Sequence, residues 1–136
     1  MAPAVWRDAA PPDLAALMDL ALAARAQLPP PFRTAAAEVQ IVVEEWPADP
    51  VLAELDIDDP RDLTGLYEGT PLTERSFDAP DGPARVTLFR RPILDEWAER
   101  GTVSLRALVT HIVVHEFAHH FGWSDGDIAT IDEWWT

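Results

Sequence analysis

Residues 104–121 constrain the fold most strongly, because this nearly continuous apolar segment holds all four histidines of the chain. Ser104 is a suitable helix N-cap, and Gly122 stands where a glycine commonly ends a helix. A helix this apolar is predicted to be buried on most sides, so its imidazoles need partners. Its apolar residues are Leu105, Leu108, Val109, Ile112, Val113, Val114, Phe117, Ala118 and Phe121.

Three residues of this segment form the pattern H-E-x-x-H, with His115, Glu116 and His119. Successive helical residues are rotated by about 100°, so the two histidines lie about 40° apart and one turn apart along the axis. Two imidazoles in this arrangement can bind one metal ion, and Glu116 lies where a general base for water would be needed. The structural alternative is a pair of core histidines with a buried carboxylate. His111 and His120 are predicted to line the cleft or to be structural.

The third metal ligand has to be a histidine or a carboxylate, because the chain contains no cysteine. A catalytic zinc ion needs three protein ligands and one open position. Gly122 allows the chain to reverse its direction, which would bring Asp125 back toward the ion. Asp125 would equally suit a helix start, so Asp125 is the first choice and other carboxylates remain open: Asp127, Asp132 and Glu133.

Tyr67 is the only tyrosine of the chain and a candidate for stabilising an oxyanion. Arg75 is a second candidate for this role. The structural alternative for Tyr67 is a packed, half-buried aromatic side chain.

The remaining pattern predicts one domain over residues 1–136, with residues 1–12 as a loose arm. Helices are expected from Asp13 to residue 28, over 92–100, and after Ser124, with short turns near 32–37 and 51–63. Strands are expected over 38–45, 66–68 and 85–91.

The formal charge of −14, with ten arginines and no lysine, argues against nucleic acid as a partner. The N-terminus lacks the pattern of a secretory signal, and no apolar run approaches the roughly 18 residues of a membrane span. The expected location is therefore the cytoplasm, with no membrane association.

Several segments together resemble the small bacterial zincin-like metallopeptidase family. They are Leu28-Pro29 with Val39–Glu45, then Gly65–Arg75, Val86–Arg90 with Pro92, and His115–Gly122 with Ser124 and Asp125. The resemblance implies an α+β minimal zincin fold, in which a small mixed β-sheet packs on a buried active-site helix with flanking helices. It also implies that the metal ligands are His115, His119 and Asp125. Metzincins carry a downstream methionine turn, whereas Met1 and Met18 both lie upstream here.

The sequence therefore predicts a zinc metallopeptidase that acts on a peptide or protein, with Glu116 as general base. We expect the substrate to dock along the strand Val86–Arg90 by strand addition. One alternative is a metal-dependent endoribonuclease, which has no need of Glu116 and favours a basic groove. Another is a non-catalytic, metal-stabilised binding module, for which Trp134 and Trp135 could mark a partner site.

Overall fold

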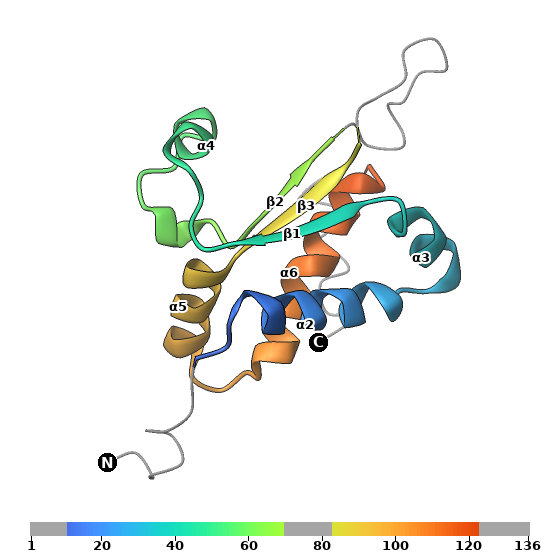
Figure 1. Ribbon diagram of the computed structural model, residues 1–136, viewed down its shortest axis with the longest axis horizontal. Coiled ribbons are helices and arrows are strands. Elements are labelled where there is room, and N and C mark those ends of the chain that lie inside the picture. Colours follow the sequence, from blue (N-terminus) through green and yellow to red (C-terminus); the bar gives the residue numbers. More distant parts are fainter. Residues whose placement is uncertain (1–10, 70–82, 123–136) are drawn as a thin grey trace.

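The computed structural model describes residues 11–69 and 83–122. This part of the chain has mixed α+β architecture, as expected (Figure 1). Its elements, in chain order, are α2 (Leu14–Ala26), α3 (Pro30–Ala36), β1 (Gln40–Glu44), α4 (Asp49–Glu54), the 3-10 turn η1 (Pro60–Asp62), β2 (Gly65–Glu68), β3 (Arg85–Phe89), α5 (Arg90–Arg100) and α6 (Leu105–His120).

The predicted helix boundaries agree closely with the structure. The Asp13 carboxylate accepts a hydrogen bond from the Ala16 amide at 2.8 Å and caps α2. Gly101 has a φ of 73° and ends α5, which starts two residues earlier than predicted. Pro92 fits inside the first turn of α5, because the N–H groups of a first helical turn have no partner within the helix. Proline at the start of a helix also explains why α3 begins at Pro30 instead of near residue 32.

The sheet has the order β1-β3-β2, so β3 is the central strand. It pairs with β1 in parallel, with Ile41 opposite Val86, and with β2 in antiparallel fashion, with Tyr67 opposite Val86. The expectation that a substrate docks along Val86–Arg90 is therefore wrong. Strands on both sides already occupy the backbone groups of β3, and Arg90 belongs to α5.

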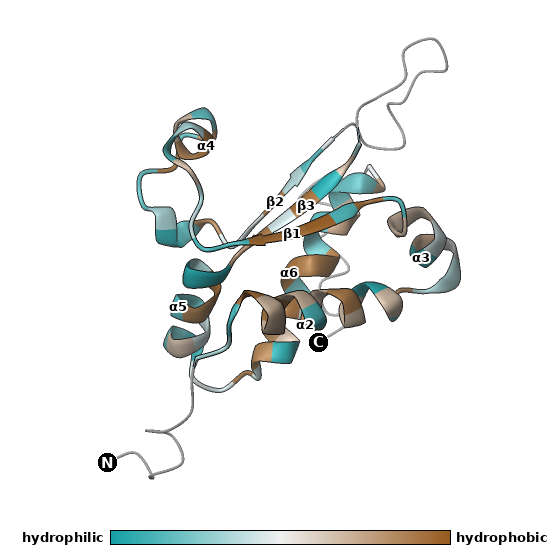
Figure 2. Ribbon diagram, in the orientation of Figure 1, coloured by the Kyte–Doolittle hydropathy of each residue, from teal (hydrophilic) through white to brown (hydrophobic). Residues whose placement is uncertain are grey.

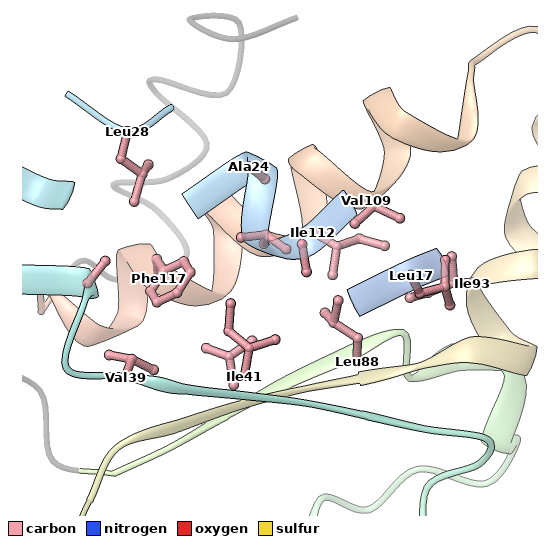
Figure 3. Close-up of a cluster of buried hydrophobic side chains, with 14 of the residues drawn as sticks. Leu17, Ala24, Leu28, Val39, Ile41, Leu88, Ile93, Val109, Ile112 and Phe117 are labelled. Carbon is pink, nitrogen blue, oxygen red and sulfur yellow. The ribbon is translucent and has the colours of Figure 1, made fainter. Parts of the chain in front are cut away.

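Helices α2 and α6 cover one face of the sheet, and the core lies between these two layers (Figure 1). Side chains from both helices and from the sheet point toward one another in this core (Figure 3). Phe117, Val109 and Leu17 are fully buried there. Colouring by hydropathy agrees with this position of the core. Apolar segments lie along β1, along part of β3 and in the middle of α6 (Figure 2). In the described ranges, no helix has the length and apolar character needed to cross a membrane.

Candidate metal centre

Helix α6 is fixed at both ends by the residues that the sequence indicated. The Ser104 hydroxyl accepts a hydrogen bond from the Ala107 amide at 3.0 Å. At the other end Gly122, with a φ of 86°, donates its amide to the carbonyl of His119 at 3.0 Å. The left-handed backbone at Gly122 turns the chain out of the helix directly after the histidine pattern.

The two histidines of the H-E-x-x-H pattern lie together on the partly exposed side of α6. Their ring centroids are 5.2 Å apart, and the ring planes are inclined by 77°. With Zn–N distances of about 2.1 Å and a tetrahedral angle, the centroids of two coordinating imidazoles are about 5 Å apart. The spacing of His115 and His119 thus fits the donor set of a single divalent ion.

Asp125 and the alternatives Asp127, Asp132 and Glu133 lie outside the described residues, as does Arg75. Within residues 11–69 and 83–122, no group of three or more histidine, cysteine or acidic side chains is arranged to hold a metal ion. The described part of the chain thus brings two imidazoles of the pattern together.

Glu116 packs against the backbone of β2. A Cβ atom built on Gly65 would lie 3.3 Å from Cγ and 3.5 Å from Oε2 of Glu116, and 2.9 Å from Cγ2 of Ile112. Only a glycine allows the strand to approach α6 so closely. The sequence alone does not indicate this close contact, although a glycine next to a predicted strand is typical of a site where another part of the chain approaches closely.

A cavity of about 280 Å³ opens beside these residues. His111, His115 and Glu116 line one side of it, and the segment from Asp62 to Gly65 lines another. The third side comes from α5, where Arg100 donates to Glu96 at 3.0 Å. His111 thus lines the cavity, which is one of the two roles predicted for it.

A second, acidic cavity of about 360 Å³ is lined in part by the same residues, Asp62 and Glu96. Its only basic lining residue is Arg61, which forms a salt bridge of 2.9 Å with Asp59. Hydrogen bonds from the Arg61 side chain and backbone lower the pKa of the Asp59 carboxyl. The surroundings of the histidine pattern are therefore mainly anionic, in keeping with the net charge.

His120 and Tyr67 contact each other, and neither is among the residues that line these two cavities. The Tyr67 hydroxyl is 2.7 Å from Nδ1 of His120, and Nε2 of His120 is 3.1 Å from Oε1 of Glu38. His120 is fully buried, in agreement with the structural one of the two roles predicted for it. Glu38 was missed, because nothing in the sequence connects it with a histidine 82 residues away.

One comparison with known proteins identifies the family of the chain. A comparison with curated proteins gives no match. Residues 36–135, more than half of the chain, match the family model of the zincin-like metallopeptidases. The matched region includes β2, β3 and the whole of α6 with its H-E-x-x-H pattern. The chain therefore belongs to the zincin-like metallopeptidase family.

Proposed function

We propose that the protein is a zinc-dependent metallopeptidase in which His115, His119 and Asp125 hold the metal ion and Glu116 is the general base. The observation that carries the proposal is the 5.2 Å separation of the His115 and His119 rings on α6. His115 and Glu116 also line the neighbouring cavity. Zn²⁺ bound by these side chains supplies Lewis acidity, which acidifies water and polarises a carbonyl group.

Glu116 is suited to proton transfer by its position one residue after His115. It lines the cavity, so a water molecule and a peptide carbonyl can reach it. In the proposed reaction Glu116 takes a proton from the attacking water and delivers it to the leaving amine. Contact with Gly65 on one side limits the directions in which the carboxylate can turn.

The outer edge of β2 is the proposed docking site for an extended peptide. Phe89 donates its amide to the carbonyl of Thr64 at 2.9 Å, so Thr64 is a hydrogen-bonded partner of β3. Such pairs alternate in antiparallel sheets, so Leu66 and Glu68 also bond to β3. Gly65 and Tyr67 then direct their backbone groups to the outer edge, next to Glu116. A peptide added there would lie beside the proposed metal ligands.

The test compares the wild-type protein with Glu116→Gln. Both proteins should bind zinc in the same amount, because the exchange leaves both imidazoles in place. Only the wild type should cleave an unfolded protein, and loss of the base should lower kcat by about 10²- to 10⁴-fold. Cleavage by Glu116→Gln at the wild-type rate would remove Glu116 from the reaction.

The third ligand needs its own variant. Asp125→Ala should weaken zinc binding strongly, as measured by competition with a chromophoric chelator. Asp127→Ala is the matched control, two residues away, and should bind zinc as the wild type does. If Asp125→Ala keeps the wild-type affinity, another side chain is the third ligand.

A further inference from the structure

We infer that His120 and Tyr67 form a positioning pair, which holds strand β2 in register with the metal-binding turn of α6. This inference rests on the proposed peptidase function and concerns how the docking edge and the metal ligands are kept together. It also gives Tyr67 a role different from that of an oxyanion donor.

The pair is built around a fully buried imidazole at the last residue of α6. With the proton on Nε2, His120 accepts a hydrogen bond from the Tyr67 hydroxyl at 2.7 Å and donates to Glu38 at 3.1 Å. The rings of Tyr67 and His120 also meet edge to face, with centroids 5.5 Å apart. One side chain of α6 is thus tied to β2 and to the segment before β1.

Strand β2 touches α6 at a second point, where Gly65 meets Ile112 and Glu116. The two contacts are two residues apart on the strand, which is about 6.6 Å. On the helix, Glu116 and His120 are four residues apart, which is about 6.0 Å. Because these lengths nearly agree, β2 and α6 can make both contacts together only in one register.

The proposed metal ligands His115 and His119 lie between Ile112 and His120, the two ends of the stretch of α6 that makes these contacts. The outward backbone groups of β2 come from Gly65 and Tyr67, the two residues that make the contacts. Loss of the Tyr67–His120 bond would remove one of these two contacts between the strand and the helix. A docked peptide would then shift relative to the metal, and a shift of about 1 Å can cost roughly a hundredfold in rate.

A double-mutant cycle on the zinc-loaded full chain tests the inference. Tyr67→Phe removes only the hydroxyl, and His120→Leu removes both hydrogen bonds of the imidazole. His120→Asn is the conservative variant, because its amide oxygen can take the place of Nδ1. For each variant, kcat and KM on a quenched peptide and the zinc bound per chain are measured.

A positioning pair predicts that Tyr67→Phe and His120→Leu each lower kcat/KM by about 10- to 100-fold, with zinc content unchanged. The double variant should be no worse than the worse single variant, and His120→Asn should recover most of the activity. Losses that multiply in the double variant would overturn the inference, because Tyr67 would then act without His120. Wild-type kcat/KM in Tyr67→Phe would overturn it as well.

Hydrogen exchange separates this inference from the proposed function. If the wild-type protein cleaves no peptide, the function fails, but the pair can still be tested. Tyr67→Phe and His120→Leu should both speed exchange at Leu66 and Glu68 in β2 and at Phe121, whose amide bonds to Phe117. Unchanged exchange at these amides would show that the pair does not hold β2 on α6.

Discussion

Substituting Gly65 by alanine perturbs the closest approach between β2 and α6. The added methyl group would lie 2.9 Å from Cγ2 of Ile112 and 3.3 Å from Cγ of Glu116. Carbon atoms are in favourable contact at about 3.5–4.0 Å, so the first contact has to open by about 0.6–1.1 Å. Ile112 is 5% exposed and packed in the core, so the strand or the Glu116 side chain has to move instead.

The size of the clash sets the expected effects of Gly65→Ala on stability and on activity. Overpacking of this kind lowers the free energy of unfolding by about 1–3 kcal/mol. Displacing Glu116 or the edge of β2 by about 1 Å would lower kcat on the order of a hundredfold. Zinc binding should be retained, because the methyl group meets neither His115 nor His119 among its nearest atoms.

Steady-state kinetics on a quenched peptide, with thermal unfolding followed by circular dichroism, measure the two effects. Gly101→Ala is the matched control. An alanine at the Gly101 φ of 73° lowers the free energy of unfolding by about 1–2 kcal/mol, because this backbone region disfavours a Cβ atom. The added Cβ atom would have no neighbour within 4 Å. This control variant should lose stability and keep the wild-type kcat. Adding Ile112→Ala to Gly65→Ala removes the closest clash and should restore part of the activity. A Gly65→Ala variant with wild-type kcat and midpoint temperature would refute the argument.

Two further predictions concern the metal and the start of α6. Chelation should lower the midpoint temperature of thermal unfolding, and added Zn²⁺ should restore it. A ligand at 100 times its Kd stabilises the folded state by about 2.7 kcal/mol. Mg²⁺ is the control and should not restore the midpoint, because it prefers oxygen ligands. A midpoint temperature that neither chelation nor added Zn²⁺ changes would argue against a bound metal in the folded state. Ser104→Ala should lower the free energy of unfolding by about 1 kcal/mol, read from urea denaturation, because it removes the cap on the Ala107 amide. Ser104→Asp should keep the cap, and equal stability of Ser104→Ala and the wild type would show that the cap contributes nothing.

Local signals in the sequence predicted the helices and the H-E-x-x-H face well. Asp13, Ser104, Gly101 and Gly122 act within one turn of their own position, so their roles depend little on the rest of the fold. The relation of His115 to His119 is equally local, because helical geometry alone fixes it. By the same geometry His120 is rotated by about 100° from His119.

Strand order and contacts between distant segments could not be predicted in this way. The strand over 85–91 was predicted, but its position between β1 and β2 was not. In the structure Val86–Phe89 is buried throughout, as is typical of an interior strand. Gly65 meets Glu116 and Tyr67 meets His120 only after three strands and two helices have come together. Such contacts depend on packing, which one sequence does not display.

The central position of β3 has a consequence for the order of folding. Both strand pairs in the described sheet include β3, so β1 and β2 have no sheet partner until residues 85–89 arrive. Pairing of β1 with β3 closes a loop of about forty residues, a slow event compared with forming a hairpin. Until then the apolar segment Ile41–Val43 stays available to other chains. Ribosome-bound or truncated forms that stop before β3 should therefore aggregate more readily than the whole chain.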